Sequence, residues 1–181
     1  MIDNNYIYEI NPDQIELDMD YFSTLGLRLD KGLDISKMRL DASEDSYTQF
    51  LYQKYPCLSP IINFYKFPPN WTLGMHVDSN RQCALNIPVK NTKDTDTVFY
   101  DFVEEPILEH NLIKKVHFVK SKVVESFRFS MTNPVLINVT NPHSVINSTQ
   151  DYRISISWSM KPDITFEQAK SIFIATYNNN K

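Results

Sequence analysis

The chain has 181 residues, of which 42% are hydrophobic and 13% aromatic, a composition that argues against disorder and suffices for one domain with its own core. The formal net charge is -4, and the three glycines are too few for a glycine-rich phosphate loop of the P-loop or dinucleotide type. Cys57 and Cys83 cannot form a disulfide scaffold and lack zinc-finger spacing, so we expect buried free thiols.

Charge is distributed unevenly along the chain. Residues 1–50 contain 11 acids and 4 bases, whereas residues 51–181 contain 11 acids and 14 bases. A nucleic-acid binder concentrates its basic residues on one face. The stretch of this chain that is richest in basic residues is better interpreted as a solvated strand pair and loop, and the alternative is a rim that meets an anionic substrate. A nucleic-acid partner is therefore not expected. That stretch contains Lys114, Lys115, Lys120, Lys122 and Arg128.

The sequence offers no signal for a membrane or for export. No apolar run approaches the roughly 20 residues that cross a bilayer, and the first residues are neither basic nor followed by a leader-like apolar stretch. We therefore expect a soluble, cytoplasmic protein, a monomer or a homodimer, organised as a single domain over residues 1–181.

The first third of the chain, residues 1–60, reads as helix and loop. A weak helix is predicted around Asp13 to Phe22, and a stronger one from Ser43 to Tyr55, ended by Pro56.

From residue 61 to residue 160 the period changes to short β-prone runs separated by Pro, Asn, Asp and Ser. Many short strands of this kind predict an all-β sandwich or jelly roll. The predicted strands are residues 61–67, 72–78, 82–89, 97–102, 115–119, 123–129, 135–139, 144–147 and 152–160.

A last helix is predicted over residues 163–178. Thr165 and Gln168 form a capping-box pattern at its start. One stripe of the helix is apolar, so it should pack on the outside of a sheet. The stripe consists of Phe166, Ala169, Ile172, Phe173 and Thr176.

Three side chains form a candidate metal-ligand set. In the strand predicted at residues 72–78, His76 and Asp78 are two positions apart and therefore share a face. The H-x-D pattern is short and weak by itself. His143 follows 65 residues after Asp78. Two imidazoles and one carboxylate are the set that leaves half the coordination sphere of non-haem Fe(II) open.

The strand predicted at residues 152–160 alternates strictly between apolar and polar residues. A solvent-exposed sheet face would give the same pattern. The alternative is that the polar side chains bind a ligand, because Arg153 can form a bidentate hydrogen bond with a carboxylate and Ser155 can add a donor from the same side. The polar positions are Arg153, Ser155, Ser157 and Ser159, and the apolar ones are Tyr152, Ile154, Ile156 and Trp158.

The order H-x-D, distal His, then R-x-S on the next strand resembles the Fe(II)- and 2-oxoglutarate-dependent oxygenase superfamily, over about residues 61–160. The segments 142–148 and 152–158 are similar to the distal half of small bacterial and phage oxygenases of the prolyl- and aspartyl-hydroxylase-like kind. The resemblance implies a double-stranded β-helix that binds Fe(II), 2-oxoglutarate and O₂. It also implies that His76, Asp78 and His143 are the catalytic iron ligands, that Arg153 pairs with the C5 carboxylate of 2-oxoglutarate, and that Ser155 is the serine of the R-x-S signature.

Further residues have open assignments. Tyr65 lies on the strand before H-x-D, where prolyl-hydroxylase-like members often place a tyrosine that bonds the co-substrate carboxylate; an ordinary cross-strand aromatic is the alternative. Asn86 either enters the barrel beside the co-substrate or satisfies neighbouring backbone. Arg81 either meets a substrate acid or caps its loop. His110 and His117 have no partner at metal-like spacing and are interpreted as structural or surface residues.

The implied activity is hydroxylation of a peptide prolyl, asparaginyl or aspartyl side chain, or of a small metabolite. Two alternatives remain: a non-catalytic jelly-roll module for binding or assembly, and a cupin-like Zn(II) or Mn(II) enzyme that does not use 2-oxoglutarate. Arg153 discriminates between them, because only a protein that binds a distal carboxylate needs a guanidinium inside the barrel. An Arg153 side chain in solvent would exclude the oxygenase.

Overall fold

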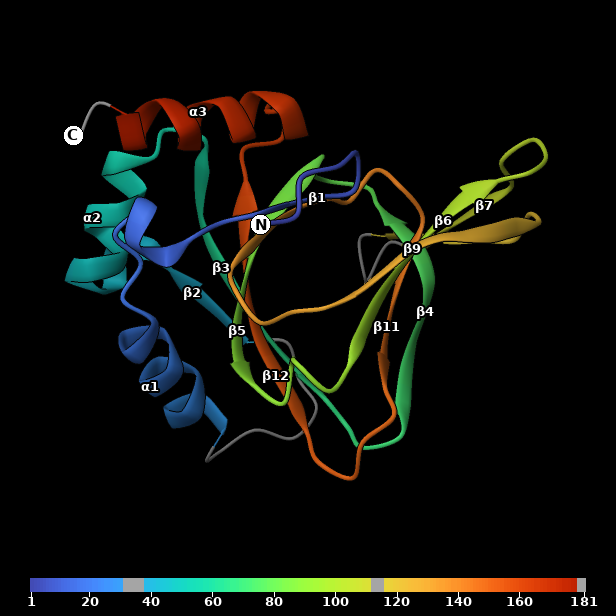
Figure 1. The fold of residues 1–181 in the computed structure, drawn as a ribbon, viewed down its shortest axis with the longest axis horizontal. Coiled ribbons are helices and arrows are strands. Elements are labelled where there is room, and N and C mark those ends of the chain that lie inside the picture. The colour runs from blue at the N-terminus through green and yellow to red at the C-terminus, as the bar shows by residue number, and fades with distance from the viewer. Residues whose placement is uncertain (31–37, 112–115, 179–181) are drawn as a thin grey trace.

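The computed structural model describes residues 1–30, 38–111 and 116–178, and it shows a mainly-β protein with flanking helices. Two antiparallel sheets of six described strands each face one another as a double-stranded β-helix, or jelly roll, which confirms the predicted fold class (Figure 1). Sheet A has the order β1 (Ile7–Glu9), β10 (Val135–Asn138), β5 (Cys83–Lys90), β12 (Arg153–Met160), β3 (Leu58–Phe67), β2 (Met38–Asp41). Sheet B has the order β7 (Leu108–Asn111), β8 (Val116–Val119), β4 (Trp71–Asp78), β11 (His143–Asn147), β6 (Asp96–Phe102), β9 (Val123–Ser130).

Three helices, α1 (Met19–Asp30), α2 (Ser46–Lys54) and α3 (Phe166–Asn178), cover the outer face of sheet A (Figure 1). The carboxylate of Asp45 caps α2 by accepting from the backbone N–H groups of Tyr47 and Thr48, at 3.0 and 2.9 Å. The predicted capping box of α3 is confirmed, since Thr165 N donates to Gln168 Oε1 and Gln168 N donates to Thr165 Oγ1.

The helix predicted from Asp13 is wrong in its bounds. A short 3-10 turn at Pro12–Gln14 is followed by Glu16 with φ of 52°, and a left-handed residue interrupts any α-helix. The helix therefore begins at Met19, after Asp18 Oδ1 accepts from the backbone N–H of Tyr21.

The apolar core between the helices and sheet A fixes the direction of every side chain on β12. Trp158, Phe22 and Phe173 belong to one buried cluster, and Trp158 Nε1 donates to the carbonyl of Ser59 at 2.8 Å. At Gly26, a Cβ would lie 2.7 Å from Cγ1 of Val89, so the absence of a side chain lets α1 approach β5. Because the apolar face of β12 packs outward against the helices, its polar face points between the two sheets.

The interpretation of that polar face as a solvent-exposed surface is therefore wrong. Arg153, Ser155 and Ser157 are only 2%, 4% and 2% exposed. Buried polar side chains in the middle of a fold are costly unless they bind one another or a ligand, so this face marks the interior that holds the site.

Three strands were not expected from the sequence: β1, β2 and β7. Each has three or four residues and lies at the edge of a sheet or in a protruding hairpin (Figure 1). The strand predicted at residues 115–119 begins at Val116; Lys114 and Lys115 lie outside the described residues.

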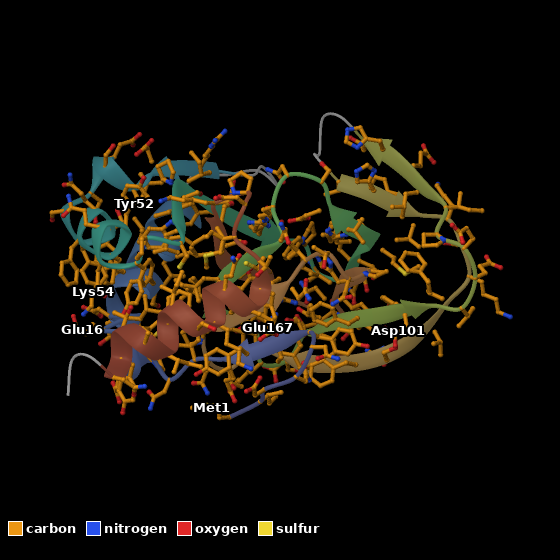
Figure 2. The ribbon with its side chains drawn as sticks, turned by 90° about the horizontal axis from the view of Figure 1, so that it is seen from above. Met1, Glu16, Tyr52, Lys54, Asp101 and Glu167 are labelled. Carbon is orange, nitrogen blue, oxygen red and sulfur yellow. The ribbon has the colours of Figure 1, made fainter. Side chains whose placement is uncertain are left out.

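The helices and the long hairpins occupy opposite ends of the molecule. Glu16, Tyr52 and Lys54 lie at the helical end and Asp101 at the other (Figure 2). Lys54 Nζ forms an ion pair of 2.7 Å with Glu16. Within the described ranges, we find no helix with the length and apolar character needed to cross a membrane.

Both cysteines are buried free thiols, as predicted. Burial raises the pKa of Cys57 to about 11 and that of Cys83 to about 12, so neither forms a reactive thiolate near neutral pH.

Candidate metal centre

Neighbouring strands bring the three candidate ligands together. β4 pairs antiparallel with β11, and their register places His143 opposite His76. One potential ligand atom from each of His76, Asp78 and His143 lies within 4.8 Å of the others. His76 Nε2 is 3.8 Å from Asp78 Oδ1, and the imidazole centroids are 4.3 Å apart. The cluster is nearly enclosed, with His76 4% and His143 5% exposed.

Backbone carbonyls orient both imidazoles for metal binding. Nδ1 of His76 lies 2.8 Å from the carbonyl oxygen of Gly74, and Nδ1 of His143 lies 3.0 Å from that of Asn141. A carbonyl oxygen only accepts, so each Nδ1 carries the proton and the lone pair is on Nε2. This carbonyl–imidazole arrangement is how proteins fix the tautomer of a metal-binding histidine.

Asp78 is held by a buried arginine. Arg81 Nε donates to Asp78 Oδ2 at 2.6 Å, and the two side chains are 9% and 8% exposed. Burial raises the pKa of Asp78, but the Arg81 guanidinium and the two imidazoles outweigh it, so this pKa lies below its ordinary value. The carboxylate is therefore ionised and suited to a divalent cation.

His143 remains neutral well into the acid range. Burial, followed by the neighbouring His76, lowers its pKa from 6.5 to about 4. A neutral imidazole is the form that ligates a metal.

The metal-free protein is expected to lose stability as the pH falls from about 6.5 to about 4. In that window the unfolded chain protonates His143 and the folded protein does not, so the free energy of unfolding decreases by up to about 3 kcal/mol. Urea unfolding at several pH values measures the slope. His143→Gln should flatten it, and an unchanged slope in this variant would contradict the assignment.

Arg153 lies deeper in the same interior. It donates to the carbonyl of Asp96 at 3.1 Å and to Thr97 Oγ1 at 3.2 Å, both on β6. Among the described residues its Nε has no hydrogen-bond partner, and the carboxylate of Asp96 acts on the guanidinium electrostatically without forming an ion pair. Burial lowers the pKa of Arg153 to about 10, so the group is still a cation at neutral pH.

The other predicted residues line this interior with differing contacts. Asn86 lies opposite Ser157 on the neighbouring strand, and its buried Oδ1 has no hydrogen-bond partner among the described residues. Ser155 lies opposite Tyr65 of β3, and Tyr65 forms a hydrogen bond with Arg81. Tyr65 also stacks on Phe67 with centroids 5.8 Å apart. Their predicted roles toward a co-substrate remain predictions.

The sequence alone did not predict several side-chain contacts around the candidate metal centre and on the β7–β8 hairpin. Arg81, for which a substrate acid or its own loop was expected as the partner, binds Asp78, a candidate metal ligand; its spacing of three residues from Asp78 was the available signal. His110 and His117, interpreted from the sequence as structural or surface residues, lie directly opposite each other on β7 and β8 with ring centroids 4.4 Å apart. Phe118, on β8, packs edge-on against His76 at 6.5 Å.

Comparison with known proteins gives structural likenesses at low TM-scores and low sequence identity. No protein-family model and no curated protein sequence matches the chain. Among solved structures, a prolyl-4-hydroxylase from Pseudomonas putida has a TM-score of 0.46 and 10% identity, covering 86% of this chain and 91% of that one. The non-haem α-ketoglutarate-dependent carbocyclase SnoK from nogalamycin biosynthesis has a TM-score of 0.46 and 7% identity, covering 84% and 76%. Vicilin from hazelnut (Corylus avellana) has a TM-score of 0.40 and 8% identity, covering 72% of this chain and 30% of the vicilin chain.

Proposed function

We propose that this protein is a non-haem Fe(II) oxygenase that consumes 2-oxoglutarate and O₂ to oxidise an organic substrate. His76, Asp78 and His143 would hold the metal, with three coordination positions left for co-substrate and O₂. Bound Fe(II) and 2-oxoglutarate would supply the oxidative decarboxylation, to succinate and CO₂, that activates O₂. The chain's own tasks are to place the ligands, exclude water and orient the substrate.

The observation that carries the proposal is the buried guanidinium of Arg153. A cation without a carboxylate partner is expensive in a protein interior, and its retention is explained by an anion that arrives with a ligand. Among the described residues, Asn86 Oδ1 is a second polar atom of this interior face without a hydrogen-bond partner, and it can accept from a ligand or from water. The donor set and these two atoms fit the proposed groups.

The spacing between Arg153 and the metal ligands matches the co-substrate. Arg153 bonds Thr97, which lies opposite Val145, whereas His143 lies opposite Phe99. The position of Arg153 and that of His143 therefore differ by two residues along the strands, or about 7 Å. The four C–C bonds of an extended five-carbon diacid span roughly 5 Å, which leaves room for metal–oxygen and hydrogen-bond contacts at its ends.

Net charge in the interior also favours a dianion. Arg81 offsets Asp78, so a divalent metal and Arg153 together leave a charge of +3 around the pocket. A doubly charged keto-diacid compensates most of it, whereas a neutral ligand leaves it uncompensated in a medium of low dielectric.

The substrate would enter on the side of β2 and the β7–β8 hairpin. β8 pairs with β4, which carries His76 and Asp78, so this hairpin borders the metal centre. The opposite side is closed by the N-terminal segment, where Tyr6 stacks on Phe127 in a cluster that includes Phe99. A peptide side chain or a small metabolite remains the proposed substrate class.

The test is an anaerobic titration of the apo protein with Fe(II) and 2-oxoglutarate, followed by air. The expected results are a weak visible charge-transfer band on chelation and then succinate, formed slowly even without the substrate. Metal binding without the band or succinate would reject the proposal in favour of a cupin-like metalloprotein, and no metal binding would favour a non-catalytic module.

A further inference from the structure

We propose that Arg81 is a positioning residue that restricts Asp78 to one metal-binding oxygen and thereby keeps three coordination positions open. The inference rests on the metal centre of the proposed function and goes beyond it, because it assigns the role of a residue outside the ligand set. It does not depend on which co-substrate occupies the open positions.

The two carboxylate oxygens of Asp78 are already distinguished. Oδ2 accepts the 2.6 Å bond from Arg81 Nε, whereas Oδ1 is the oxygen 3.8 Å from His76 Nε2. A short charge-assisted hydrogen bond between buried groups is among the strongest that side chains form. A metal that approached both oxygens would compete with this bond for Oδ2, which favours coordination through Oδ1 alone.

Arg81 is itself fixed from the opposite sheet. Its NH1 donates to Ser157 Oγ at 3.2 Å and to Ser159 Oγ at 2.9 Å, both on β12, and Tyr65 on β3 adds a further hydrogen bond. Asn63 Nδ2 in turn donates to Ser159 Oγ at 3.3 Å. The planar guanidinium thus bridges sheet A to the end of β4, a task that the single ammonium of a lysine cannot perform with the same geometry.

Counting coordination positions gives the functional consequence. With one oxygen from Asp78, the protein would supply three of the six ligands of a bound Fe(II), and a bidentate keto acid and O₂ would need the remaining three positions. A bidentate Asp78 would fill a fourth position and leave one reactant without a place. The pairing of Arg81 also cancels the charge of Asp78, which preserves the attraction of the metal for an anionic ligand.

Binding of Mn²⁺ alone tests the inference, because water-proton relaxation reports the number of water molecules bound to this ion. Wild-type protein should carry three exchanging waters per Mn²⁺, and this signal should be lost in His143→Gln. Arg81→Gln should still bind Mn²⁺, but Asp78 should become bidentate, so the inner-sphere relaxivity per bound ion should fall by about one third.

Arg128→Gln is the matched control, because Arg128 also bonds a carboxylate three residues away, Glu125, but on the exposed face of β9. It should retain three waters. If Arg81→Gln does not fold, as judged by its thermal transition, Arg81→Lys replaces it and should give a relaxivity below the wild-type value. If the Arg81 variant that folds has the relaxivity of the wild type, the inference is overturned.

The outcomes separate this inference from the proposed function. Three waters in the wild type, fewer in the Arg81 variant and no succinate would reject 2-oxoglutarate chemistry and support the role of Arg81. Succinate formation with an unchanged water count in the Arg81 variant would support 2-oxoglutarate chemistry and reject the role of Arg81. A wild type that does not bind Mn²⁺ would overturn both.

Discussion

Replacing Arg153 with methionine is expected to stabilise the ligand-free protein and, at the same time, to remove most of its affinity for 2-oxoglutarate. Arg153 is 2% exposed, and burial lowers the pKa of its guanidinium to about 10, because the charged form is unfavourable there. Methionine has a similar length and no charge to desolvate, so the free energy of unfolding should rise by about 1–3 kcal/mol. A binding site that costs stability is typical of function.

The loss of affinity should be larger than the gain in stability. Removing one partner of a desolvated charge pair costs about 2–5 kcal/mol, which corresponds to a weakening of the 2-oxoglutarate dissociation constant by roughly 30-fold to several thousand-fold. Calorimetric titration of the metal-loaded protein measures it, and urea unfolding of the apo protein measures the stability. Arg128→Met, at an exposed ion pair, should change the free energy of unfolding by no more than about 1 kcal/mol and leave binding unchanged. Unaltered affinity in Arg153→Met would reject the anion site.

The strands that build the site were predictable because their sequences alternate strongly. His76 and Asp78 are two positions apart on β4, so any strand through them places both on one face. The alternation of β12 likewise identified the polar side chains that share one face. The sequence did not show whether this face points into the protein or toward solvent. The helices decided it: three of them cover the apolar side, which turns Arg153 inward.

Other features depend on tertiary contacts that leave no periodic trace. The strand β1 has three residues and is stabilised through pairing with β10, so no local pattern distinguishes it from a loop. Arg81 lies in the turn after β4, and its bonds to Ser157 and Ser159 span more than 70 positions of sequence. The approach of His110 to His117 follows from the hairpin register, which the sequence did not specify.

The interior therefore combines two kinds of polar group that respond differently to mutation. Arg81 is paired with Asp78 and connects the sheets, so its loss changes structure near the candidate metal ligands. Arg153 has no carboxylate partner among the described side chains, so its loss relieves a penalty when no ligand is bound. Under the proposed function, the same residue type thus serves as a support at one end of β12 and as a binding group at the other.

Asp78→Ala is expected to abolish metal retention. It removes the anionic ligand of the triad, and the loss should exceed the roughly 10- to 100-fold decrease in metal affinity that follows when an outer hydrogen-bond partner of a ligand is removed. Alanine also leaves Arg81 buried without its carboxylate, at a cost of about 3–5 kcal/mol in stability.

Asp78→Asn separates these two effects. Its amide oxygen can still accept from Arg81 while its amide nitrogen, facing the imidazoles, cannot ligate, so the metal should be lost with a smaller loss of stability. Metal content after dialysis against a weak chelator, with thermal unfolding in parallel, measures both. Arg153→Met should retain the metal under the same conditions, because Arg153 bonds Asp96 and Thr97 and none of the three candidate metal ligands. Equal metal loss in the Asp78 and Arg153 variants would contradict the proposal that Asp78 binds the metal and Arg153 binds the co-substrate.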